Sequence, residues 1–518
     1  MANGKVTRGV LRRRVLQAGG ALGLAGVLGG PLAALAPSRA RAATGGSVLR
    51  LGIDIDPVTL DTRITQPVSA CGLIMQVNEP LVHRDGNMKT IGLLAESWEP
   101  VSGKGWRFKL RRGVKFHNGE EFNAESVKYT IESYQDQNLK WVHTQSRAYV
   151  TAIEKVEIES PYSVLLATKG FSRALVSQLS AVTMLPPKAA AQAGQSFGLK
   201  PIGTGRYRFV EYVPGSRIVL ETNPSYWGQK PRNDRLEMRI LKENSTRLAA
   251  LESGEVKLIN NVPPDAVNRL KSRPELVVVQ VPTTRLMHIQ MQYDRGVFAD
   301  KRLRHAVNYA LDKEALVKSI MGGMAEVAHN PWSTSAIGTN KNLPQYDYNP
   351  TKAKQLMAEA GKPNGFEFTF GSPAGRYLQD KLMAEAIVQQ LAKVNIKVQL
   401  DAREWGGFWQ NLTERKYDAG FVGYAIPTMD PEWAAQWLWK SSLVGFKNDK
   451  VKQLFQAADA TPDVAKADQL YQEAQVLVWE DAPFAQLYFQ PEIDAHSKDV
   501  KGWKPRTDEY LIFWDAEI

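Results

Sequence analysis

The stretch Trp106–Tyr129, WRFKLRRGVKFHNGEEFNAESVKY, places a strand, a turn and the start of a helix in immediate succession. Three apolar residues alternate with polar neighbours, which is the period-two pattern of a strand: Trp106, Phe108 and Leu110. Gly113 follows a basic pair and predicts the turn. Asn123 can then cap a helix. The apolar residues of that helix recur at spacings of four and three: Val127, Ile131 and Tyr134.

Helical and extended patterns alternate along the rest of the chain. Residues 48–53, VLRLGI, form a short apolar run that ends before Pro57 and predicts a first strand. Farther on, four apolar residues recur at helical spacing: Met383, Ile387, Leu391 and Val394. Alternating apolar residues typical of a strand follow directly: Ile396, Val398 and Leu400. This order predicts a mixed α/β protein with more than one lobe.

The first 42 residues have the layout of an export signal. A basic head precedes a weakly apolar middle, and Ala40-Arg41-Ala42 offers a small-x-small cleavage site. Arg12-Arg13, followed by one residue and then Val15-Leu16, resembles the twin-arginine consensus. The match departs from that consensus, since no Ser or Thr precedes the pair and Val15 replaces the usual Phe. An ordinary Sec signal with a basic head is the alternative.

The composition bounds the mature protein further. No cysteine stands at the end of the signal, where a lipid would be attached, so we expect a soluble periplasmic protein. Cys71 is the only cysteine, so the fold must be held by its core and not by disulfides. The signal contributes seven of the positive charges in the net +11, which leaves the mature chain near +4. Spread over this length, that charge predicts no nucleic-acid partner.

Motifs that would indicate catalysis are weak. Ser196 lies in a G-x-S-x-G string, but a nucleophile elbow needs a strand before the serine, and an alanine-rich stretch stands there. Gly203-Thr204-Gly205 lacks the third glycine of a dinucleotide loop, and the residues after it predict a strand. The seven histidines never occur at metal-ligand spacing on one element. We therefore expect no catalytic residue, no cofactor and no metal, and an extracytoplasmic hydrolase is disfavoured.

Four longer strings resemble the extracellular solute-binding proteins of family 5, which serve ABC importers of peptides and nickel. The strings are residues 93–99 with 106–129, residues 201–228, residues 246–259, and residues 298–317 with 347–361. They occur in family order, and the matches run from about residue 48 to residue 490.

This resemblance implies a periplasmic binding protein fold of type II, with two lobes, an extra domain and a hinge that the chain crosses twice. The implied division is domain I at 44–78, 200–282 and 490–518, domain II (the extra domain) at 79–199, and domain III (the second lobe) at 283–489. Closure about the hinge would bury a ligand between the lobes.

The resemblance also implies ligand-binding residues. Arg376 resembles the arginine with which dipeptide-binding members hold the C-terminal carboxylate of the ligand, a task that suits a planar guanidinium. Asp430 lies where those members place the aspartate for the α-ammonium, although an Asp before a Pro can instead cap a helix. Trp405 matches a position near the cleft. Trp409 and Tyr424 offer further aromatic faces.

The implied role is the substrate-binding protein of an ABC import system. It would capture di- or oligopeptides, or peptide-like solutes, and deliver them to separate permease and ATPase subunits, itself a monomer. Oligosaccharides and opine-type conjugates are the alternative ligands, because aromatic walls suit sugar rings as well as apolar side chains.

Overall fold

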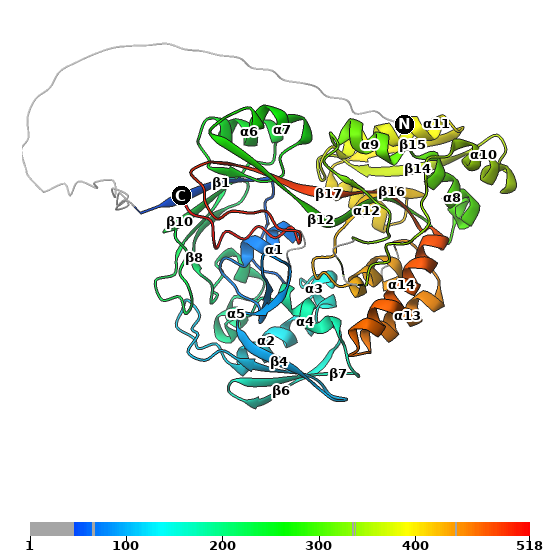
Figure 1. Cartoon of the computed structure of the whole chain (residues 1–518). Helices are drawn as coiled ribbons and strands as arrows, with labels where there is room; N and C mark the ends of the chain where they lie inside the picture. The colour runs from blue at the N-terminus through cyan, green and yellow to red at the C-terminus, as the bar shows by residue number, and fades with distance from the viewer. Residues whose placement is uncertain (1–45, 65–67, 334–335, 337, 441–442) are drawn as a thin grey trace, which may run out of the picture. The chain divides into compact units, whose positions relative to one another are not determined.

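Among the described residues, an 11-stranded sheet runs through the computed structural model (Figure 1). The structure describes residues 46–518 apart from 65–67, 334–335, 337 and 441–442, so the export signal expected at 1–42 lies outside the described residues. The strands of the sheet, in spatial order, are β15 (Ile396–Arg403), β14 (Phe366–Pro373), β16 (Ala419–Tyr424), β12 (Leu276–Met291), β17 (Phe484–Ser497), β11 (Leu258–Ile259), β1 (Val48–Ile53), β10 (Arg235–Ile240), β9 (Arg217–Thr222) and β8 (Tyr207–Val213), with β13 (Glu326–Val327) paired to β17.

Two long antiparallel strands, β12 and β17, join the two halves of this sheet. Residues 276–282 of β12 pair with 491–497 of β17, and after a break in register 286–290 pair with 484–489. Beyond the break on one side β17 pairs with β11, and on the other β12 pairs with β16. The chain therefore passes between the two halves of the sheet twice, once along β12 and once along β17.

The first half of the sheet has parallel strands at its centre. β1 spans the residues that the sequence predicts and pairs in parallel with both β10 and β11. Its apolar side chains Leu49, Leu51 and Ile53 are fully buried, as expected for a strand flanked on both sides. The helices next to these strands in sequence are α1 (Val68–Ile74), α6 (Asn244–Glu252) and α7 (Pro264–Lys271).

Strands between residues 95 and 168 form a separate four-stranded sheet, which packs on a buried cluster of its own. The strand order is β4 (Ala95–Val101), β5 (Gly105–Leu110), β7 (Ser163–Thr168) and β6 (Ile153–Ser160), and β2 (Val82–Arg84) pairs with β3 (Thr90–Gly92). The helices are α2 (Ala124–Gln135), α3 (Thr144–Ala148), α4 (Ala174–Gln178) and α5 (Pro187–Ala193). The strand expected at 106–110 and the helix expected after Asn123 are both present, as β5 and α2. Asn123 caps α2 as expected, by accepting from the backbone N–H of Glu125 at 3.0 Å.

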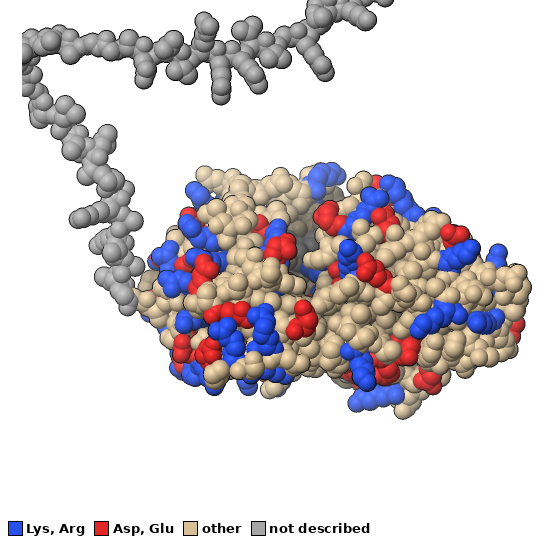
Figure 2. All heavy atoms as spheres, turned by 90° about the horizontal axis from the view of Figure 1, so that it is seen from above, with Lys and Arg blue, Asp and Glu red and all other residues tan. Residues whose placement is uncertain are grey.

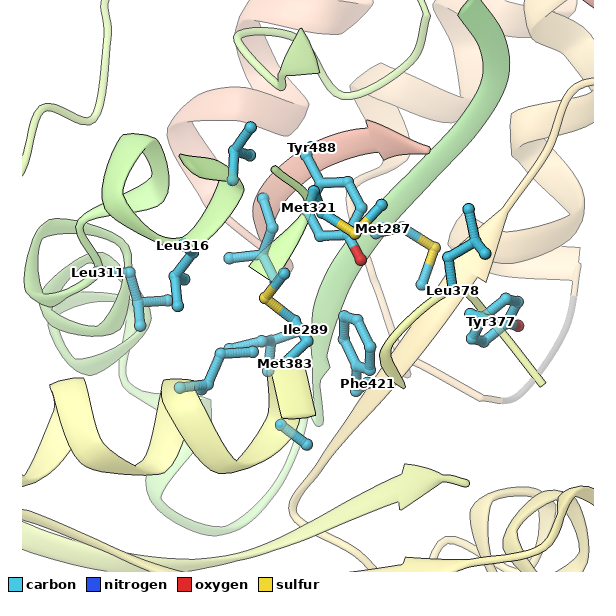
Figure 3. Packing of buried hydrophobic residues seen from close by; sticks show 14 of the residues in the cluster. Met287, Ile289, Leu311, Leu316, Met321, Tyr377, Leu378, Met383, Phe421 and Tyr488 are labelled. Atoms are coloured by element: carbon cyan, nitrogen blue, oxygen red, sulfur yellow. The ribbon is translucent and has the colours of Figure 1, made fainter. Parts of the chain in front are cut away.

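The other α-helices of the described residues lie between β12 and β17 in sequence. They are α8 (Lys301–Ala310), α9 (Lys313–Ile320), α10 (Pro350–Glu359), α11 (Asp380–Ala392), α12 (Trp405–Thr413), α13 (Asp449–Asp459) and α14 (Val464–Asp481). Figure 3 shows Ile289 of β12, Phe421 of β16 and Met383 of α11 packed together in the largest buried cluster. Tyr377 belongs to this core and Trp405 packs against it, and both residues also line the cavity described below.

The string at residues 201–228 closes around the buried carboxylate of Glu79. Thr204 Oγ1 donates to this carboxylate at 2.9 Å, Tyr226 OH at 2.6 Å and Trp227 Nε1 at 3.1 Å. Gly203 packs so closely on the neighbouring backbone that an added Cβ would lie 1.9 Å from the carbonyl oxygen of Val77. Gly203 and Gly205 therefore form a tight turn that packs on neighbouring backbone and leads into β8, as the sequence indicates, and not a dinucleotide-binding loop.

Glu79 makes the stability of the fold depend on pH. Burial raises the pKa of Glu79 to about 7, above its ordinary 4.5. The protonated carboxyl of Glu79 therefore stabilises the folded state fully at pH values below 4.5, the pKa in the unfolded chain. This stabilisation is lost as the pH rises through about 7, the pKa in the folded protein. We expect Glu79→Gln to remove a pH dependence on the order of 3 kcal/mol between these two values, measured by urea unfolding across that range. A profile parallel to that of the wild type would contradict this expectation, and the exposed Glu221→Gln serves as control.

Ser196 does not stand in a nucleophile elbow. It lies in a 3-10 helix, η2 (Gly194–Leu199), which follows α5 and not a strand. Its Oγ donates to the carbonyl of Ala193 at 2.7 Å. The local geometry thus agrees with the interpretation from sequence.

Acidic and basic side chains are interspersed on the face shown in Figure 2, with no continuous stripe of one sign. Within residues 46–518, as far as they are described, no helix combines the length and apolar character needed to span a bilayer.

Candidate ligand-binding cavity

A cavity of about 280 Å³ is lined by two separated stretches of the chain, residues 62–181 on one side and 285–437 on the other. Six of its lining residues are aromatic: Tyr149, Tyr377, Trp405, Trp409, Trp433 and Trp437. Among the described residues that line it, two are arginines, Arg285 and Arg376, and none is an aspartate or glutamate. The cavity therefore combines apolar walls with positive charge.

Arg376 is held by the loop between β14 and α11. The buried carboxylate of Asp380 accepts from the backbone N–H groups of Gly375, Arg376 and Tyr377 at 2.9, 2.8 and 3.0 Å, which folds this loop tightly. The guanidinium lies 5.3 Å from the ring centroid of Trp405 and 5.5 Å from that of Tyr377. No carboxylate of the described residues lies within ion-pair distance of it. Arg376 is therefore positioned by its backbone and by the neighbouring rings, without a carboxylate partner among the described residues.

Trp405 and Trp409 form the aromatic wall beside Arg376. They lie one turn apart on α12, with ring centroids 5.2 Å apart and nearly parallel planes. Glu404 caps this helix by accepting from the N–H of Gly407 at 2.8 Å. Trp437 meets the Trp409 ring edge-on at 6.2 Å. The structure thus brings Arg376, Trp405 and Trp409 together at one cavity.

Arg285 of β12 brings a second guanidinium to the cavity, but its charge is compensated. Its Nε lies 3.1 and 3.0 Å from the two carboxylate oxygens of Glu509, and the pair is almost fully buried. Sequence patterns give no sign of this pair, because the partners are far apart in the chain. The one local signal is a charged residue in the middle of β12, directly before Leu286.

A smaller cavity of about 40 Å³ adjoins the first and shares Arg285, Arg376 and Tyr377 with it. Its wall includes the acidic residues Asp54, Glu492 and Glu509. Burial, with the nearby carboxylates of Asp494, Glu509 and Asp54, raises the pKa of Glu492 well above its ordinary value. The acidic residues of this smaller cavity therefore favour a positively charged group beside them.

Asp430, expected from sequence to bind the ligand, is not among the residues that line either cavity. Its Oδ1 accepts from the N–H of Glu432 at 2.9 Å and so caps the 3-10 helix η4 (Pro431–Ala434). Its Oδ2 lies 3.2 Å from Nη2 of Arg173, and both side chains are largely buried. In this structure the Asp430 carboxylate is therefore paired within the protein.

Tyr424 also stands behind the wall of the main cavity. It is the last residue of β16, is 4% exposed, and meets the Trp437 ring at 5.1 Å. Tyr424 therefore packs against Trp437, and Trp437 is itself one of the residues that line the main cavity.

Comparison with known proteins agrees with this architecture. The sequence matches the model for "Bacterial extracellular solute-binding proteins, family 5 Middle" over residues 89–446. The chain belongs to this family. Glutathione-binding protein GsiB of Pectobacterium atrosepticum is 30% identical over 483 residues, which cover 90% of this chain and 92% of that protein.

Solved structures of other proteins share the fold of this solute-binding protein. DppA from Helicobacter pylori, in complex with the peptide STSA, has a TM-score of 0.83 at 25% identity, covering 91% of this chain and 98% of that one. AgaA from A. tumefacien R10, in complex with agropinic acid, has a TM-score of 0.81 at 24% identity, covering 91% and 98%. The latter likeness concerns the fold alone. The two-lobed α/β fold expected from the family resemblance is confirmed.

Four contacts, which we call the latch, join the two sides of the cavity in this solute-binding protein. One is the Arg173–Asp430 pair. Two are made by Asp459, which accepts from Ser172 Oγ at 3.0 Å and from the N–H of Ala174 at 2.8 Å. The fourth stacks Tyr149 on Trp433, with centroids 4.5 Å apart and planes 5° from parallel. The latch therefore links residues 149–174 to residues 430–459.

Proposed function

We propose that this solute-binding protein captures short peptides or peptide-like solutes, and that Arg376 binds a carboxylate of the ligand. The observation that carries the proposal is a guanidinium without a carboxylate partner in the wall of an aromatic cavity. Burying such a charge is costly unless an anion pairs with it, and a carboxylate can accept two parallel hydrogen bonds from it. The names of the relatives, a glutathione-binding protein and a DppA in complex with a peptide, support this class of ligand.

The dimensions and walls of the cavity favour a small ligand. Its volume of about 280 Å³ lies at the lower end of the range for small-molecule pockets, about 300–1,000 Å³. Trp405 and Trp409 offer flat faces for apolar side chains. We infer that a ligand ammonium turns toward Asp54 and Glu492 in the adjoining cavity, since the main cavity wall offers it no described carboxylate.

We infer further that the ligand is enclosed by closure of two lobes. The domain boundaries given by the family resemblance put the hinge in β12 and β17, where the register of their pairing is irregular. A ligand that contacts both sides of the cavity would favour the closed state. The proposed partners are a membrane permease and an ATPase, which would receive the ligand from the closed form.

An opine-type conjugate is the second candidate ligand. It is favoured by the uncompensated Arg376 and by the lack of a described acidic residue in the main cavity wall, which suit an anion without a free amine. N-acetylated peptides separate the two candidates. If they bind as tightly as the free peptides, the ammonium is not recognised and the anionic conjugate becomes the better description.

The experiment that tests the proposal is a thermal-shift screen of the purified mature protein with di- to pentapeptides, glutathione, opines and sugars. A ligand that binds only the folded state raises the melting temperature. We expect peptides to raise it and Arg376→Ala to abolish that rise. Shifts with sugars alone would contradict the assignment.

We propose export through the twin-arginine route, on the sequence of the first 42 residues. Replacing both Arg12 and Arg13 with lysine is expected to leave most of the protein as uncleaved precursor in the cytoplasm, because that route reads the arginine pair. Cell fractionation with immunoblotting measures this. Undiminished export of the double variant would show a Sec signal instead, and the replacement of Arg8 alone serves as control.

A further inference from the structure

A second and larger cavity lies apart from the candidate ligand site. Its volume is about 640 Å³, and it shares no lining residue with the two cavities described above. Its wall is made by the end of β2, by the first half of β12, by Arg206 ahead of β8, and by residues 502–516 beyond β17. The family role assigns no task to this cavity.

Two arginines in this wall have no carboxylate within ion-pair distance among the described residues. Arg84 is 4% exposed and donates only to backbone carbonyls, those of Thr428 and Met88. Arg206 lies over the Trp514 ring at 4.6 Å and over the Tyr226 ring at 5.6 Å. The Nε atoms of both arginines and Nε1 of Trp514 are buried without a hydrogen-bond partner in the described structure.

The charges around these arginines leave the wall positive. A third arginine, Arg506, pairs with the buried carboxylate of Asp508 at 2.6 Å and also donates to the carbonyl of Arg84 at 3.0 Å. Glu79, which acts electrostatically on Arg206, already accepts three hydrogen bonds. The pKa of His83 is lowered well below its ordinary value by burial and by Arg506, Arg206 and Arg84.

Acids that face the cavity lie at its rim. Asp515 is exposed, and Lys504, also exposed and in the same wall, carries the opposite charge. Asp85 is engaged by the backbone N–H groups of Asn87 and Lys89, both at 2.9 Å. The inner wall therefore keeps two guanidinium groups with no described carboxylate within ion-pair distance, and Asp508 and Asp430 act on Arg84, and Glu79 on Arg206, only at longer range.

Apolar groups stand beside these cations. Trp514 is 7% exposed and packs against His83 at 4.6 Å. Ile512, Leu93 and Val279 complete an apolar surface in the same cavity. A wall that offers both guanidinium groups and a broad apolar face fits an anion attached to an apolar body.

We propose that this second cavity binds a small organic anion, a carboxylate or phosphate on a planar apolar body, with Arg84 and Arg206 at the anionic group and Trp514 at the body. An anion there would offset the cost of one buried and one half-buried charge, each without a carboxylate in ion-pair distance. The proposal does not depend on which ligand occupies the main cavity, because the two cavities share no residue.

Isothermal titration of the mature protein with phenyl phosphate, benzoate and inorganic phosphate, at constant ionic strength, tests this proposal. We expect phenyl phosphate or benzoate to bind more tightly than inorganic phosphate, and Arg206→Gln to weaken that binding at least about tenfold, the effect of losing one charge-assisted hydrogen bond. Arg208→Gln is the matched control, since Arg208 lies two residues on and pairs with Glu221 on the surface.

Three results would overturn the proposal: no binding of any of these probes, equal binding of inorganic phosphate, or unchanged binding by Arg206→Gln. If Arg206→Gln fails to fold, Trp514→Phe keeps a ring and removes the buried Nε1 donor. Two results would then together contradict the proposed site. One is that Trp514→Phe binds both aromatic anions as tightly as the wild type, and the other is that neither anion changes the Trp fluorescence of the wild type.

Discussion

Replacing Arg376 with alanine is expected to weaken binding of a carboxylate ligand about 100-fold, the loss that follows when one partner of an enclosed charge pair is removed. The melting temperature of the unliganded protein should change little, because the Arg376 guanidinium has no described carboxylate partner to lose. Arg376→Lys should recover only part of the affinity, since an ammonium cannot offer the two parallel donors of a guanidinium. Isothermal titration with the best peptide from the screen measures each value.

Arg403→Ala is the matched control for this prediction. Arg403 lies nearby in the fold, on β15, but its side chain is 52% exposed and pairs with Asp401 on the surface. Its removal should leave peptide affinity within about twofold, as is usual for exposed ion pairs. Unchanged peptide binding by Arg376→Ala would remove this residue from the site.

Breaking the latch should have the next largest effect. Arg173→Met leaves the Asp430 carboxylate, 5% exposed, without its cation while the two sides of the cavity are joined. Loss of one partner of a buried pair costs about 3 kcal/mol. Because Asp430 can regain water when the sides separate, the cost falls on the closed state, and ligand affinity should drop by up to about 100-fold.

The double variant Arg173→Met/Asp430→Leu separates this account from direct ligand contact. If Asp430 acts through the latch, removing both charges should restore much of the affinity lost in Arg173→Met. If Asp430 instead binds the ligand ammonium, the double variant should bind no better than Asp430→Leu alone, and Arg173→Met should bind almost normally. Titration with one free-amine peptide distinguishes these results, and Lys155→Met, in an exposed ion pair, is the control.

Local patterns in the sequence predicted the elements whose signals are themselves local. The alternation at Trp106–Leu110 and the cap at Asn123 depend on residues a few positions apart, and the structure has both. The first strand at 48–53 follows from one apolar run with a clear end. For Arg376 and Trp405, the family resemblance supplied what periodicity could not, and the structure places both at one cavity.

Features that join distant parts of the chain could not be read from patterns. Asp430 stands before a proline, so its cap is visible in sequence, but its partner Arg173 lies 257 positions earlier and is marked by no motif. The Arg285–Glu509 pair and the acids of the smaller cavity are likewise created only when β12, β17 and the C-terminal segment come together. Tertiary packing decides which charges meet, and a single sequence does not state it.

Titration of the wild-type protein with a matched pair of ligands, the best-binding peptide and the same peptide with its C-terminus amidated, tests the central claim most directly. The two ligands differ only in the carboxylate that Arg376 is proposed to hold. We expect the free acid to bind and the amide to bind at least about 30-fold more weakly, in keeping with a loss of about 2 kcal/mol for a charge-assisted contact. Equal affinity for acid and amide would contradict the assignment of Arg376 as the carboxylate-binding residue.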